Sequence, residues 1–207
     1  MPQLGCFRSS CGSNCSCSWK KDIGFCKNLS KAAKKHPSGR ERRKYSSMHI
    51  WTIEDWKKNL QDGIPRRTGL RFRYNRDVHP EVKRACSQFG IWLRTQYHFP
   101  LRVVIYVKGT RTIRTHDGDR VVGSFFEPFS YQDEPYVRIA TGDYEELKSN
   151  LGNDNALASI LLSLAHELTH YYQWINNIQL TPIGRERQAT RYARYIIDEY
   201  ALTREHP

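Results

Sequence analysis

One apolar stretch, ASILLSLAHELTHYYQWINN at residues 158–177, constrains the fold of this chain more than any other. Its length and its wealth of leucine and alanine predict a helix, which we expect to run from about residue 155 to residue 177. Two histidines and a glutamate interrupt it, in the pentapeptide HELTH at residues 166–170. Burying such polar groups in an apolar helix is costly unless a partner satisfies them. We therefore expect the fold to supply a partner for HELTH.

The spacing within HELTH suits one bound metal ion. Residues four apart lie on one face of a helix, so His166 and His170 can direct both imidazoles at the same ion. Glu167 is rotated off that pair, next to the position of a metal-bound water. Zn²⁺ lowers the pKa of such a water, and a neighbouring carboxylate can then accept its proton. HELTH therefore predicts a zinc-binding helix with Glu167 as catalytic base, and a chance match in a core helix is the alternative.

A catalytic zinc site needs a third protein ligand and one open position. The sequence after HELTH offers His206 near its end, Asp198 and Glu199 late in the last predicted helix, and Glu186 at the start of that helix. Counting from Glu186, one helical face collects small and apolar residues, namely Ala189, Thr190, Ala193 and Ile197. A carboxylate on such a face is unusual without a partner. We predict Glu186 as the third ligand; a glutamate that merely favours a helix N-terminus is the alternative.

HELTH followed by the helix ERQATRYARYIIDEY resembles the gluzincin arrangement, which is HExxH plus a glutamate on the next helix. It is most similar to the ImmA/IrrE-like metallopeptidases and the minimal gluzincins, whose later helix tends to read E-x-x-A-N-x-F-A. Here that stretch reads ERQATRYA, with Thr190 where asparagine is usual. The resemblance covers roughly residues 80–203. It implies a zincin-like fold, zinc held by His166, His170 and Glu186, and hydrolysis of peptide bonds.

SprT-like proteins, which associate with DNA, share the layout of a strand followed by HExxH and rank second. They usually take a third histidine as ligand, and the sequence has none between residues 170 and 206. In this second interpretation the chain is a DNA-associated zinc protein, in which the basic N-terminal region and the surface from 57 to 120 contact the nucleic acid. An inactive, metal-free binding module is a third interpretation.

The remaining sequence predicts strands grouped together rather than alternating with helices, which favours an α+β fold. We expect a zincin-like metallopeptidase domain: a small mixed or antiparallel sheet packed on the HELTH helix and on a C-terminal ligand helix. The predicted helices before the strands are a short one within 52–63 and one from Pro80 to before Pro100, and the last helix runs from about 183 to 203. The strand at 136–140 is expected to be an edge that pairs with a substrate peptide by β-addition.

The net charge of +12 is unevenly distributed along the 207 residues. Residues 1–47 hold 11 Lys and Arg against 2 Asp and Glu, whereas residues 48–207 hold 22 against 19. The first segment is also rich in serine and poor in aliphatic residues, so we expect a basic, disordered tail before a domain at 48–207. Such a tail favours association with nucleic acid. A chain that functionally begins at Met48 is an alternative.

Five of the six cysteines lie in that tail, at positions 6, 11, 15, 17 and 26. Their spacings do not form paired C-x-x-C knuckles, so a second zinc site there is only weakly indicated. No run approaches the roughly 18 apolar residues of a membrane span, and the N-terminus lacks the apolar core of a secretory signal. We therefore expect a cytoplasmic protein that acts on a protein or peptide and has no membrane partner.

Overall fold

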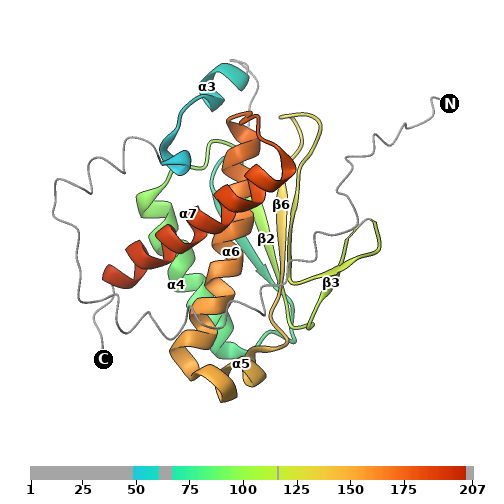
Figure 1. The fold of residues 1–207 in the computed structure, drawn as a ribbon, viewed down its shortest axis with the longest axis vertical. Helices are drawn as coiled ribbons and strands as arrows, with labels where there is room; N and C mark the ends of the chain where they lie inside the picture. The colour runs from blue at the N-terminus through green and yellow to red at the C-terminus, as the bar shows by residue number, and fades with distance from the viewer. Residues whose placement is uncertain (1–48, 61–66, 116, 204–207) are drawn as a thin grey trace.

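A mixed β-sheet and the helices beside it form the two layers of the fold (Figure 1). The computed structural model describes residues 49–60, 67–115 and 117–203. The tail predicted at residues 1–47 lies outside these ranges, and so does His206. Within the described residues the chain has the α+β architecture that the order of its elements predicts.

Helices α4, α6 and α7 supply most of the helical layer. The bounds are α4 Pro80–Gln96, α5 Tyr144–Leu151, α6 Asn153–Ile175 and α7 Pro182–Leu202, preceded by the 3-10 turn η2 Ile50–Thr52 and the single turn α3 Trp56–Asn59. Pro80 is the first residue of α4, as predicted, and the His79 side chain caps that helix by accepting from the Glu81 N–H. In Figure 1, α7 runs obliquely across α6, and these two helices share the most extensive contact of any pair.

The sheet has the spatial order β1, β2, β6, β5. Its strands are β1 Leu70–Tyr74, β2 Val103–Lys108, β5 Gly123–Phe126 and β6 Tyr136–Ala140. Strand β2 runs parallel to both β1 and β6, whereas β5 runs antiparallel to β6. A two-stranded hairpin of β3 Ile113–Arg114 and β4 Arg120–Val121 stands apart from this sheet. Its turn contains Gly118 at φ +90°, a left-handed conformation that glycine adopts without strain.

The strand predicted at 136–140 forms at those residues, as β6, but its predicted role as an edge is wrong. β2 pairs with one side of β6 and β5 with the other, so neither side is open to an added peptide. The chain before β6 folds back on it because Phe125 of β5 pairs with Val137 while its ring packs on Trp174 of α6. The edge strand beside the HELTH helix is therefore β5.

Two other elements differ from the expectation. The helix predicted within 52–63 is divided into η2 and α3, and residues 61–66 lie outside the described ranges. Helix α3 contacts the C-terminal end of α6. The Trp56 N–H donates to Asn176 Oδ1, and the Asn59 side-chain amide donates to the Ile175 carbonyl, both at 3.0 Å. Helix α5 was not predicted. Gly152, at φ +82°, separates it from α6.

The core lies between the sheet and α6. The inward residues Ile105 and Val137 of the sheet and Leu168 of α6 are fully buried. Ala189, Ala193 and Ile197 on α7 are also buried, as predicted for this face, and the two alanines allow α7 to approach α6 closely. Thr190, predicted on the same face, is only half-buried. None of the described helices combines the length and the apolar content that crossing a membrane requires.

Candidate metal centre

The two histidines of HELTH and Glu186 meet where α7 crosses α6. The Nε2 atoms of His166 and His170 lie 3.2 Å apart. The Glu186 carboxylate reaches both rings, with Oε2 3.2 Å from His166 Nε2 and Oε1 3.3 Å from His170 Nε2. One ligand atom from each of the three residues falls within 4.8 Å of the others. The fold thus brings together the three residues predicted as metal ligands.

Local structure explains how Glu186 arrives there. The helical repeat places His166 and His170 on one face of α6. Thr181 caps the start of α7 by accepting from the Gly184 N–H at 3.1 Å, and Pro182 occupies the first helical position. Glu186 consequently lies in the second turn of α7, directly before the alanine face that packs against α6.

Gln173 orients one of the two imidazoles. Its Oε1 lies 2.7 Å from His170 Nδ1, and its Nε2 donates to the Arg185 carbonyl and to Gln188 Oε1, both at 3.0 Å. When His170 Nδ1 carries the proton and donates to Gln173, its Nε2 offers a lone pair to an ion. Sequence reasoning did not find Gln173. Gln173 could have been identified from its spacing, because it follows His170 by three residues and residues three apart share a helical face.

The three candidate ligands are electrostatically coupled. Hydrogen bonds from His166 and His170 hold the pKa of the Glu186 carboxyl well below its usual range. Burial lowers the pKa of His170, but the hydrogen bond to Glu186 and the negative charges of Glu167 and Glu186 outweigh burial and raise it overall. The short contacts between each imidazole and the Glu186 carboxylate take up the space that a divalent cation would fill. Metal binding would therefore release protons.

Glu167 lies between the histidines and the edge strand. An added Cβ on Gly123 of β5 would be 2.6 Å from Glu167 Oε1, so the strand passes directly over the carboxylate. The Phe125 N–H donates to the same carboxylate. Burial raises the Glu167 pKa more than the two histidines lower it. A carboxylate with a raised pKa beside a metal site is suited to accept a proton, as general-base catalysis requires.

The other carboxylates considered as third ligands lie elsewhere. Glu199 accepts hydrogen bonds from the hydroxyls of Tyr97 and Tyr195, the second at 3.0 Å. Asp198 is exposed further along α7. Of the described candidates, Glu186 is the one that reaches HELTH.

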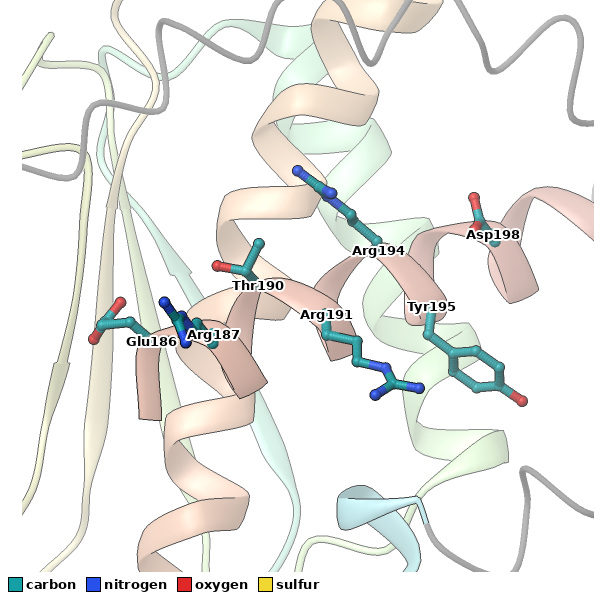
Figure 2. A pocket seen from close by; sticks show the side chains of 7 residues that line it. All are labelled: Glu186, Arg187, Thr190, Arg191, Arg194, Tyr195 and Asp198. Atoms are coloured by element: carbon teal, nitrogen blue, oxygen red, sulfur yellow. The ribbon is translucent and has the colours of Figure 1, made fainter. Parts of the chain in front are cut away.

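A shallow depression of about 540 Å³ extends from Glu186 along α7 (Figure 2). Its described lining residues all come from this helix: Glu186, Arg187, Thr190, Arg191, Arg194, Tyr195 and Asp198. Besides Glu186, the depression is lined by three arginines and by one carboxylate, that of Asp198. The surface that leads along α7 to Glu186 is therefore positively charged. Sequence reasoning did not single out these arginines, although their spacing of three and four residues places them on one helical face.

A scan against protein-family models finds no match for this chain, and searches of curated proteins and of solved structures find none either.

Proposed function

We propose that the chain is a zinc-dependent peptidase with a zincin-like fold. The observation that carries this proposal is the convergence of His166, His170 and Glu186 within hydrogen-bonding distance of one another, beside the half-buried Glu167. Two imidazole nitrogens and one carboxylate are a donor set that zinc hydrolases use, and it leaves the fourth position of a tetrahedral ion open. The residues present therefore fit a catalytic zinc.

Each residue has a distinct task in this proposal. His166, His170 and Glu186 would hold the ion, and Gln173 would fix the ring orientation and tautomer of His170. A bound zinc ion would lower the pKa of a water and polarise a substrate carbonyl. Glu167 would accept a proton from the attacking water and return it to the leaving amine. The raised pKa of Glu167, caused by its burial, supports its role as a proton acceptor.

The free edge of β5 supports a peptide as substrate. Among the described strands, β5 pairs on one side only, with β6, and its other side faces Glu167. An extended peptide that adds to this edge would bring its backbone close to the proposed general base. Gly123 has no side chain, which allows β5 to pass this close to Glu167. In this proposal β5, rather than the strand at 136–140, is the edge strand that pairs with the peptide.

The test combines metal content with the detection of cleavage. We expect the purified full chain to contain zinc in near-stoichiometric amount and to cut members of a peptide library, with new termini identified by mass spectrometry. Glu167→Gln should retain the zinc and lose the cleavage. Absence of zinc would defeat the metal assignment, whereas zinc without any cleavage beyond that of Glu167→Gln would defeat the peptidase assignment alone.

A further inference from the structure

The sheet face opposite α6 carries an ordered set of basic and aromatic residues. Alternate residues of a strand point to opposite faces, and the register aligns the outward ones across all four strands. Two rows result, each in the order β1, β2, β6, β5: Arg71, Val104, Tyr136 and Phe126, then Arg73, Tyr106, Arg138 and Ser124. The intervening residues Ile105 and Val137 are fully buried, whereas Arg71 and Arg73 are exposed. In Figure 1 the three long helices lie on one side of this sheet.

The rings on this face form a continuous group. Phe126 and Tyr136 stack with centroids 4.6 Å apart and an interplanar angle of 8°, and Tyr106 meets Tyr136 edge-on at 5.9 Å. The guanidinium carbon of Arg73 lies 6.0 Å from the Tyr106 ring centroid, and that of Arg138 lies 5.9 Å from the Tyr136 centroid. Cations and rings therefore alternate over the surface, at distances typical of cation–π contact.

Cross-strand packing accounts for the rings but not for the charge. Aromatic pairs on neighbouring strands stabilise a sheet by themselves. The two rows contain no carboxylate, however, and Lys108 adds a further cation on the same side of β2. Within the described part of the chain, none of Arg71, Arg73, Lys108 and Arg138 forms an ion pair with an acidic residue. Repelling cations gathered without counter-charges indicate an anionic partner.

We propose that this sheet face binds single-stranded nucleic acid. Its phosphates would lie on Arg71, Arg73 and Arg138, and two or three of its bases would stack on the rings of Tyr106, Tyr136 and Phe126. A duplex fits the face poorly because its bases are already stacked and a flat sheet cannot enter a groove. An acidic peptide matches the charge but offers no flat bases to stack on the exposed ring faces.

This site is separate from the metal centre. Phe125, on the inward side of β5, packs on Tyr171 and Trp174 of α6, so the outward rows lie across the sheet from the HELTH helix. The two sites can be occupied together, and the nucleic-acid site does not depend on the proposed peptidase activity.

Fluorescence anisotropy of labelled oligonucleotides with the full chain tests the site. We expect oligothymidylate or oligouridylate to bind more tightly than a duplex of equal length. Comparing the affinity for oligothymidylate with that for oligouridylate distinguishes a DNA ligand from an RNA ligand. Affinity should fall with salt, and Arg71→Ser with Arg73→Ser should lower the slope of log affinity against log salt by roughly 0.7 per lost phosphate contact. The matched control, Arg187→Ser with Arg191→Ser, removes the same charge from exposed positions on α7 and should have little effect.

The rings provide the decisive comparison, because removing them leaves the charge unchanged. Phe126→Ser, at a side chain already 37% exposed, and Tyr136→Leu should each weaken binding at least about fivefold, whereas Tyr136→Trp should retain it. Thermal unfolding of each variant verifies that it is folded. Equal losses in the sheet and α7 variants, unchanged affinity in the ring variants, or equal competition by poly-glutamate would overturn the proposal.

Discussion

Glu186 Oε1 lies 3.3 Å from His170 Nε2, across the junction of α7 and α6, although fifteen residues separate the two in the chain. Each helix contributes to the same group of donor atoms, so an ion bound there would hold the two helices together. A ligand that binds the folded state alone stabilises it by a free energy that grows with the logarithm of its concentration divided by Kd. Metal binding and tertiary stability should consequently be coupled in this protein.

Removing Glu186 should abolish that coupling. We expect zinc to raise the melting temperature of the wild-type chain, with a stabilisation of about 4 kcal/mol at a free zinc concentration a thousand times Kd. Glu186→Ala should show little shift, and chelator should not change its melting temperature. Asp198→Ala, which removes an exposed carboxylate from the same helix, is the control and should respond to zinc as the wild type does. An unchanged zinc response in Glu186→Ala would exclude this residue as a ligand.

Gln173→Ala should weaken zinc binding without unfolding the chain. The substitution removes the hydrogen bond partner of His170 Nδ1, and loss of such a partner typically lowers metal affinity about 10- to 100-fold. Competition with a chromophoric chelator measures the change. Gln188→Ala removes a partner of Gln173 but no direct contact with His170, so its effect should be smaller. Equal losses in both variants would mean that Gln173 acts only through the packing of α7.

Gly123→Ala should impair hydrolysis more than metal binding. The new Cβ would be 2.6 Å from Glu167 Oε1, so the carboxylate must move from its place beside the histidines. A displaced general base should lower kcat about tenfold or more, while zinc content stays near that of the wild type. Ser124→Ala, at the next residue but on the opposite sheet face, should leave kcat unchanged. If Gly123→Ala retains full activity, the position of Glu167 under β5 is not required for catalysis.

His49 should make the fold sensitive to mild acid. Burial lowers the pKa of this histidine to about 4, and its Nδ1 accepts a hydrogen bond from the Trp51 N–H, which the protonated ring cannot do. The unfolded state takes up a proton on this histidine below its pKa of about 6.5, whereas the folded state does so only near pH 4. The stability is therefore fully present above pH 6.5 and is lost progressively as the pH falls towards 4. The loss between pH 7 and pH 5 should be about 2 kcal/mol in the free energy of unfolding.

Denaturant unfolding at the two pH values measures the effect, as the difference between the wild type and His49→Phe. The phenylalanine ring can retain the contacts with Tyr192 and Tyr195, whose centroids lie 4.5 and 4.7 Å from that of His49, but it cannot be protonated. Taking the difference removes the titration of the metal centre, which both chains share. An identical loss of stability in both chains would show that His49 does not titrate in this range.

Local periodicity alone defines the two helical faces that carry the candidate ligands. The spacing of His166 and His170 defines one helical face, and the alanines after Glu186 define another; the structure places the two faces against each other. The strand at 136–140 and the helix beginning at Pro80 were likewise predictable, because hydrophobic pattern and proline position act over a few residues. The zinc itself and the peptidase activity stay predictions.

Only the tertiary structure decided which strand is the edge and what covers Glu167. β6 lies inside the sheet because β2 pairs with one side of it and β5 with the other. β5 is held there by Phe125, which packs on Trp174 of α6, 49 residues further along the chain. The close approach of Gly123 to Glu167 and the alignment of Arg73, Tyr106 and Arg138 across three strands have the same origin. The spacing of residues on a helix face depends only on residues a few positions apart. Sheet order and register depend on which distant segments bury their apolar faces together.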